Sequence, residues 1–257
     1  ARNDNRVKAI ILRVSSPGGS YVASDTILHA LTAARDDGLP VIVSMSDMAA
    51  SGGYFVALAA DHVVAHPNTI TGSIGVVSGK LNLSRFLAEY GIRTDSVSAG
   101  RNADMFSPTR PFSAAESARL DAVLDTIYED FTAKVAAARR LGPVEIDGAA
   151  RGRVWSGEDA KRIGLVDVLG GYAEAEGLAR DAAGIAPETH SMLVAYPEQK
   201  QDLDAFVAAL EEGEIGESLS RLEALLTFIR YSGIIQSVLN TTGGDRIEAA
   251  TSPIIVR

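Results

Sequence analysis

A serine between an apolar run and a helix-like run is the residue of this chain best placed to act as a nucleophile. Residues 41–45 are apolar and indicate a buried strand, residues 52–60 indicate a helix, and Ser51 directly precedes that helix. A hydroxyl at such a corner lies near the amides of the helix N-terminus, which can bind the oxyanion that its attack creates. The alternative is that Ser51 only caps the helix, a role that serine fills well.

A second glycine-rich turn strengthens the case for chemistry. Residues 9–14 are apolar except for Arg13 and predict a buried strand, which runs into Pro17, Gly18 and Gly19 before another helix. Proline fixes φ, and paired glycines let the backbone approach a ligand with N–H groups exposed. Turns that follow parallel strands lie at the same edge of a sheet, so one turn can supply the nucleophile and the other an oxyanion donor.

Three motifs in one order identify a family resemblance. They are Ser-Pro-Gly-Gly at 16–19, Met-Ala-Ala-Ser-Gly-Gly-Tyr at 48–54 and Thr-Gly-Ser-Ile-Gly-Val at 71–76. Together they resemble the signal peptide peptidase A (protease IV) family of bacterial serine–lysine peptidases, over roughly residues 6–185. The glycine-rich turns alone equally suggest the wider Clp protease and crotonase superfamily. The resemblance implies an α/β fold, a crotonase-like spiral of βαβ units.

The resemblance also assigns roles to residues. It implies Ser51 as the nucleophile and the amides of Gly18 and Gly52 as the oxyanion hole. It also implies that Ser73 orients a lysine amine, although Ser73 could simply satisfy the loop backbone. No metal or organic cofactor is implied, and the sequence has no Cys/His cluster with metal-ligand spacing.

The lysine general base is missing from its place. In short, single-repeat members a Gly-x-x-Lys-Asp segment supplies this lysine, and the equivalent segment here, 100–104, has Ala103 at that position. In long members the amino-terminal repeat carries the lysine and the carboxy-terminal repeat carries the serine. The chain therefore resembles a carboxy-terminal repeat of a long member, lacking its first elements because residues 1–5 run straight into the first strand.

Other lysines and the histidines are weaker candidates for the base. Lys8 lies about 20 Å from the first turn at about 3.3 Å per residue, and Lys134 is expected to be a solvated charge late in a long helix. Lys80 is the one local candidate, but a catalytic lysine must be desolvated to be neutral. The remaining lysines are Lys161 and Lys200. The histidines suggest no triad and are His29, His62, His66 and His190.

Composition and length set the expected organisation and partners. The chain has 257 residues, 46% of them hydrophobic, and we expect a peptidase domain over 1–195 and a helical tail over 196–257 for packing or oligomerisation. A net charge of −9 argues against nucleic acid as a partner. The resemblance implies peptide substrates, an amino-terminal repeat and a homo-oligomer, a tetramer in the family. It also implies the periplasmic face of a bacterial inner membrane, with the anchor outside this sequence, which has no run long enough to span a bilayer.

Two helical patterns stand out. Residues 113–140 open with a Ser113/Glu116 capping box and carry an apolar stripe suited to the core or a subunit contact. The stripe is Leu120, Val123, Leu124, Ile127, Phe131 and Val135. The first helix should bury the face of Val22, Ile27, Leu28 and Leu31. In the tail, 222–239 is amphipathic and could pack on the core, on a neighbouring subunit or on a membrane surface.

The expected reaction is hydrolysis of peptide bonds through an acyl-enzyme. The resemblance suggests cleaved signal peptides and other extended apolar segments as substrates, bound by strand addition beside the site. Two alternatives remain open. The chain could be a non-catalytic structural repeat, since Ala103 replaces the lysine, or a crotonase-type acyl-CoA enzyme, although no basic site for an adenine phosphate is evident.

Overall fold

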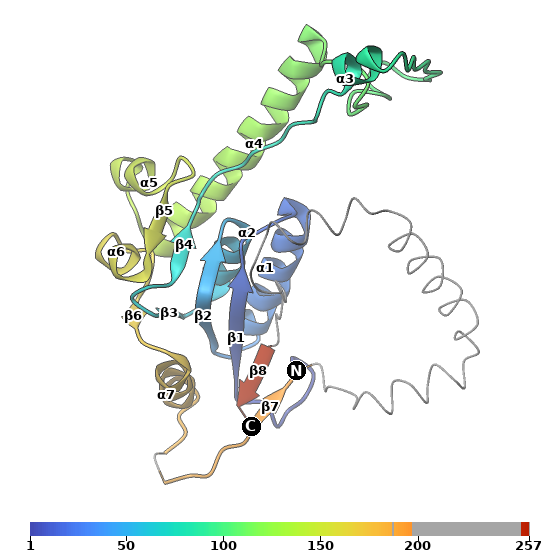
Figure 1. Ribbon diagram of the computed structural model, residues 1–257. Coiled ribbons are helices and arrows are strands. Elements are labelled where there is room, and N and C mark those ends of the chain that lie inside the picture. Colours follow the sequence, from blue (N-terminus) through green and yellow to red (C-terminus); the bar gives the residue numbers. More distant parts are fainter. Residues whose placement is uncertain (187, 197–252, 257) are drawn as a thin grey trace, which may run out of the picture.

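A computed structural model describes residues 1–186, 188–196 and 253–256 (Figure 1). The strands are β1 (Ala9–Ser16), β2 (Val41–Ala50), β3 (His62–Ala65), β4 (Ile70–Gly72), β5 (Val154–Ser156), β6 (Val168–Leu169), β7 (Leu193–Ala195) and β8 (Pro253–Val256). The helices are α1 (Tyr21–Asp36), α2 (Gly52–Phe55), the 3-10 helix η1 (Val56–Ala59), α3 (Ser84–Glu89), α4 (Ala114–Arg139), α5 (Pro143–Ala149), α6 (Gly157–Arg162) and α7 (Tyr172–Ala182).

The sheet curls around its longest strand, β2. One edge of β2 pairs in parallel with β1, while the other edge pairs with β3 through residues 42–44 and with β4 through residues 48–50. Since two strands share one edge of β2 at different heights, the sheet bends between them. The predicted α/β class is confirmed as a mixed α/β domain with a curled sheet, and a crotonase-like spiral is not established beyond that.

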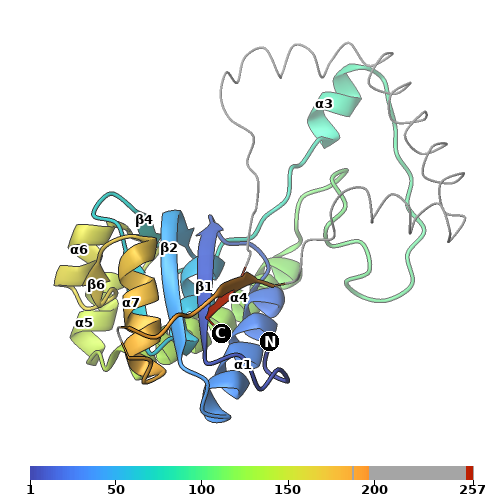
Figure 2. The same ribbon diagram turned by 90° about the horizontal axis from the view of Figure 1, so that it is seen from below.

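The alternation of side chains along the strands builds two apolar layers. Odd positions of β2, such as Val41 and Val43, join the larger core, and Ile42 joins a smaller one with Ala175 and Ala179 of α7. Figure 2 shows α7 on one side of β1 and β2, with α1 and α4 on the other. Burial on both faces explains why these strands read as continuous apolar runs.

The long helix α4 belongs to the body only in its second half. Its predicted capping box is confirmed, because the Ser113 hydroxyl accepts from the Glu116 amide and the Glu116 carboxylate accepts from the Ser113 amide. Phe131 and Val135 are buried, whereas Val123 keeps 40% of its surface exposed. Figure 1 shows why: the first half of α4 runs away from the sheet, with α3 near its outer end. The predicted stripe therefore reaches the core only at its C-terminal end.

One expectation about packing needs correction. Helix α1 buries Leu28 and Leu31 as predicted, but Val22 and Ile27 are 71% and 45% exposed. The buried face begins instead at Ser24, which packs under the glycine-rich turns.

The predicted helical tail is not helical throughout. Residues 253–256 form β8, which pairs antiparallel with β1 and β7. The amphipathic stretch 222–239 and Lys200 lie outside the described residues. Within the described ranges, no helix is both long and apolar enough to cross a bilayer.

Candidate active site

Ser51 sits at a strained corner between β2 and α2. The strand continues to Ala50, the helix begins at Gly52, and the serine between them has φ 53° and ψ −118°. A positive φ is uncommon for a residue with a side chain and costs on the order of 1–3 kcal/mol, so such residues persist only where the surroundings impose them. The Ser51 side chain makes no capping hydrogen bond to α2. The interpretation of Ser51 as a simple helix cap is therefore wrong.

The hydroxyl-bearing corner faces a cavity of about 600 Å³. One part of its lining is backbone-rich and consists of Gly19, Ser51, Gly52 and Ser73. Another part is apolar and largely aromatic, and consists of Tyr21, Phe55, Ile127, Tyr128 and Phe131. A bound peptide could thus place a carbonyl group next to Ser51 and one of its apolar side chains against the aromatic part of the cavity.

The glycines of the first turn are required by close approach. Gly18 has φ +108°, and a Cβ there would lie 2.8 Å from both the Gly52 nitrogen and the Ser51 Cβ. Only a residue without a side chain lets the two turns meet in this way. The sequence prediction that both turns lie at one edge of the sheet is confirmed by this contact.

The predicted oxyanion donors differ in availability. The Gly18 amide donates to the Ser16 hydroxyl at 3.1 Å, so it is engaged. Gly19 lines the cavity, and its amide makes no hydrogen bond with any described residue. The Gly52 amide is the first of α2 and has no intrahelical acceptor. The geometry accordingly favours Gly19 over Gly18 as the partner of Gly52.

Ser73 occupies a second strained turn on the same cavity. It has φ 48°, and its amide donates to the Arg153 carbonyl at 2.8 Å. Its hydroxyl forms no hydrogen bond with the described residues, so it does not satisfy the loop backbone there. The structure brings Ser51 and Ser73 to one cavity, as the motif order suggested.

The lysines lie elsewhere. Lys80 donates to the Met105 carbonyl at 2.5 Å, with its nitrogen 4.3 Å from the centroid of the Phe112 ring. Lys8 and Lys161 are exposed, and no lysine of the described part of the chain lines the cavity. The histidines within reach of the motifs, His29, His62 and His66, are exposed and do not line it either.

Lys134 is not the solvated charge that its sequence position suggested. Its amine contacts Asp130 at 2.5 Å on the same helix and Asp25 at 3.2 Å on α1, above the rings of Phe55 and Tyr21. Burial alone would lower the pKa of Lys134, but its hydrogen bonds to the two carboxylates raise it well above the ordinary value. A lysine held in its charged form cannot serve as a general base. The contact with Asp130 is an i,i+4 pair readable from sequence, whereas the one with Asp25 joins two helices and is not.

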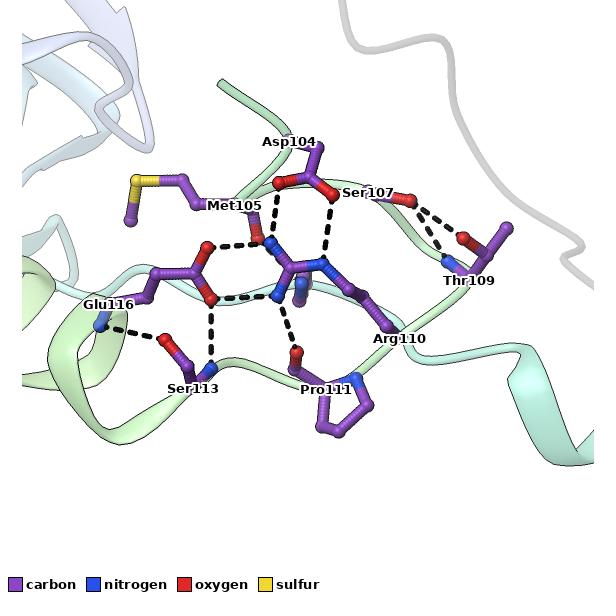
Figure 3. A network of polar contacts seen from close by, with 9 residues as sticks. Asp104, Met105, Ser107, Thr109, Arg110, Pro111, Ser113 and Glu116 are labelled. Atoms are coloured by element: carbon purple, nitrogen blue, oxygen red, sulfur yellow. Dashed lines mark hydrogen bonds and ion pairs between the residues drawn. The ribbon is translucent and has the colours of Figure 1, made fainter. Parts of the chain in front are cut away.

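The position of the absent lysine, Ala103, belongs to a segment folded around Arg110. The Arg110 guanidinium binds both carboxylate oxygens of Asp104 and both of Glu116, as Figure 3 shows. Hydrogen bonds from Arg110 and from the Ser113 amide lower the pKa of Glu116 to about 2. This segment joins α3 to α4 beyond the sheet, and Ala103 does not line the cavity (Figure 1).

No group of three or more His, Asp or Glu side chains among the described residues is arranged to hold a metal ion. The polar lining of the cavity consists of three serines, two tyrosines, Arg151 and the backbone of the glycine-rich turns.

A strained serine between two glycine-rich turns at the edge of a parallel sheet is an arrangement typical of serine hydrolases. Comparison with known protein families identifies the family. The sequence model of peptidase family S49 matches residues 33–186, which is more than half of the sequence. The chain belongs to this family, so the resemblance drawn from the three motifs is confirmed.

Similar proteins carry matching names. The chain is 45% identical over 183 residues to Protease 4 of Salmonella typhi, covering 71% of this chain and 29% of that protein. It is 40% identical over 178 residues to Protease 4 of Haemophilus influenzae, covering 68% and 28%. It is 34% identical over 216 residues to a chloroplastic serine protease SPPA of Arabidopsis thaliana, covering 84% and 32%. The chain thus spans about a third or less of these relatives, as one repeat of a longer protein would.

Proposed function

We propose that this chain is the nucleophile-bearing repeat of a serine peptidase that cleaves peptide bonds through an acyl-enzyme. The observation that carries the proposal is Ser51 itself, held at φ 53° on the cavity without a capping role. Strain of this kind is retained where a side chain must be presented in one direction. Family membership favours a peptidase over the acyl-CoA enzyme considered as an alternative.

In the proposed reaction the Ser51 hydroxyl attacks the scissile carbonyl and loses its proton to a base. The carbonyl oxygen becomes an oxyanion, which accepts hydrogen bonds from the Gly52 amide and from the turn at Gly18 and Gly19. The free amide of Gly19 supports it as the second donor, while the bond from Gly18 to Ser16 would have to break first. Each such donor is worth about 3 kcal/mol in the transition state.

The proton acceptor is proposed to be a lysine of another repeat. Ala103 cannot accept a proton, and Lys80 and Lys134 are hydrogen-bonded to other groups and do not line the cavity. The hydroxyl of Ser73, which forms no hydrogen bond with another described residue, is suited to hold the incoming amine beside Ser51. A base supplied from outside would also explain why, among the described residues, neither a lysine nor a histidine lines the cavity that holds the strained serine.

Extended apolar peptides, including cleaved signal peptides, are the proposed substrates. The aromatic side of the cavity suits an apolar side chain next to the scissile bond. Residues 75–77 line the cavity, and residues 75–79 belong to no helix or strand and form no backbone hydrogen bonds with the described residues, which supports strand addition by a peptide there.

Assembly with other repeats is part of the proposal. The segment that connects β4 to α4 carries several large apolar side chains that are exposed to solvent. Apolar surface of this extent is typical of a protein–protein interface. They are Val77, Leu81, Leu83, Phe86, Tyr90, Ile92, Val97 and Phe106. We propose a homo-oligomer, a tetramer by family resemblance, anchored at the inner membrane with this domain in the periplasm. Light scattering and cell fractionation of the complete protein test these points.

The test of the proposed function compares the complete protein with its Ser51→Ala variant. The proposal expects cleavage of an extended apolar peptide by the first and a loss of at least about 10³-fold in the second. Ser46→Ala is a matched control, because Ser46 is a serine on β2 outside the cavity. Unchanged turnover in Ser51→Ala would refute the assignment and leave the non-catalytic repeat as the better account.

A further inference from the structure

One part of the cavity wall is a contact between a helix and a loop that are far apart in sequence. Tyr128 lies on α4 and Arg151 follows α5, and the Tyr128 hydroxyl accepts the Arg151 amide at 3.2 Å. Both residues line the cavity that contains Ser51. The Tyr128 ring is partly buried and packs against the main core, which holds the hydroxyl in position.

The loop that Tyr128 holds is bonded in turn to the Ser73 turn. The Gly152 amide donates to the Ile74 carbonyl at 2.8 Å, and the next carbonyl, that of Arg153, accepts the Ser73 amide at 2.8 Å. Packing here is close, since a Cβ on Gly75 would lie 3.1 Å from the Gly152 Cα. A shift of residues 151–153 would therefore move Ser73.

The loop is in a conformation that needs support. Arg151 has φ 59° and Gly152 has φ 70°, so two consecutive residues are left-handed. Glycine accepts this conformation freely, but arginine does not. The Arg151 side chain donates to Asp147 on α5. The backbone of Arg151 is held from α4 by the Tyr128 hydroxyl, which accepts its amide.

We propose that Tyr128 is a positioning residue for the peptidase reaction. Its ring forms part of the cavity wall, and its hydroxyl fixes the left-handed Arg151, which sets the loop that places Ser73 beside Ser51. The inference rests on the proposed function, because it presumes that Ser73 must be placed for a reaction at Ser51. The Tyr128 side chain would then have two tasks: its ring contacts the bound substrate, and its hydroxyl holds the loop that places Ser73.

The test uses the complete protein and a fluorogenic extended peptide with an apolar residue before the scissile bond. Tyr128→Phe keeps the ring and removes the acceptor, so kcat should fall about five- to tenfold with KM within about twofold. Tyr128→Leu removes the ring as well, and KM should then rise too. The matched control is Tyr196→Phe, which removes a tyrosine hydroxyl bonded to Asp4, remote from the cavity, and should leave both constants unchanged.

Two further readouts separate placement from general stability. In Tyr128→Phe the amides of Arg151 and Ser73 should exchange hydrogen faster, while the thermal unfolding midpoint stays close to that of the parent protein. A kcat equal to that of the parent would overturn the inference, as would a kcat loss without faster exchange at these amides. An inactive parent protein whose Ser51 takes no covalent probe would instead refute the proposed function itself.

Discussion

The amide of Ser51 donates to the carbonyl of Gly72 at 2.9 Å, and this bond ties the two strained turns of the cavity together. Ser73 follows Gly72 directly, so the proposed nucleophile and the proposed amine-orienting hydroxyl are coupled through one peptide unit. The parallel pairing of β2 with β4 continues up to this point, with Ala50 opposite Gly72. The curled sheet is thus what sets the separation of the two serines.

Replacing Gly52 by alanine should damage the oxyanion hole. A Cβ at this position would lie 2.5 Å from the Ser24 hydroxyl oxygen and 3.2 Å from the Gly19 nitrogen, so the two turns must separate. We expect kcat/KM to fall about 100-fold, the effect of losing one oxyanion donor. Peptide hydrolysis by the complete protein measures it.

Two companion variants make this prediction specific. Adding Ser24→Ala removes the nearest clashing atom and should restore part of the activity. Gly177→Ala on α7, where a Cβ meets open space, should leave activity intact and add up to about 1 kcal/mol of stability. A Gly52→Ala protein as active as its parent would show that the amides of this corner do not bind the oxyanion.

How far the sequence predicts the site depends on which contacts are local. The corner at Ser51 and the meeting of the turns follow from apolar runs and glycine positions, because parallel strands bring their carboxyl ends to one edge. The strand before Ser51 nevertheless extends past the apolar run to Ala50. Asp47 is exposed, but residues 48–50 pair with β4, and Ala49 and Ala50 are buried.

The remaining differences come from side chains that meet only in the fold. The engagement of Gly18 depends on the rotamer of Ser16, and one of the two ion pairs of Lys134 depends on Asp25 of a different helix. Neither contact has a periodic signature. The contact of Tyr128 with Arg151 is of the same kind, so the sequence offers no signal for it.

Acid should loosen the segment around Ala103 before it unfolds the body. The pKa of Glu116 is lowered to about 2 from an ordinary value of 4.5, so its ion pair with Arg110 adds stability that is complete above about pH 4.5 and is lost as the pH falls through about 2. Hydrogen exchange of residues 100–113 should therefore lose protection between these values. Glu116→Gln should reduce that protection already at neutral pH, with Glu89→Gln, an exposed carboxylate of α3, as the control. Equal protection in Glu116→Gln and its parent would contradict the role given to Arg110.

Restoring a lysine at Ala103 should not create an active site within one chain. Ala103 belongs to the segment beyond the sheet and does not line the cavity. The amine of a lysine introduced there could therefore reach only the Ser51 of another copy of the chain. We expect the isolated Ala103→Lys chain to show less than about 1% of the activity of the complete protein. Any recovered activity should rise with the square of chain concentration at low concentration. Activity that is strictly proportional to concentration down to the monomer would contradict the arrangement.

The most direct test of the account is to locate the residue that a serine-directed covalent probe modifies in the complete protein. Mass spectrometry after reaction with a fluorophosphonate should find the adduct on Ser51, and labelling should be lost in Ser51→Ala and kept in Ser46→Ala. Because the base is proposed to be a neutral lysine, the labelling rate should rise with pH through the pKa of that lysine. An adduct on a different serine of an active protein, or full peptidase activity in Ser51→Ala, would contradict the central claim.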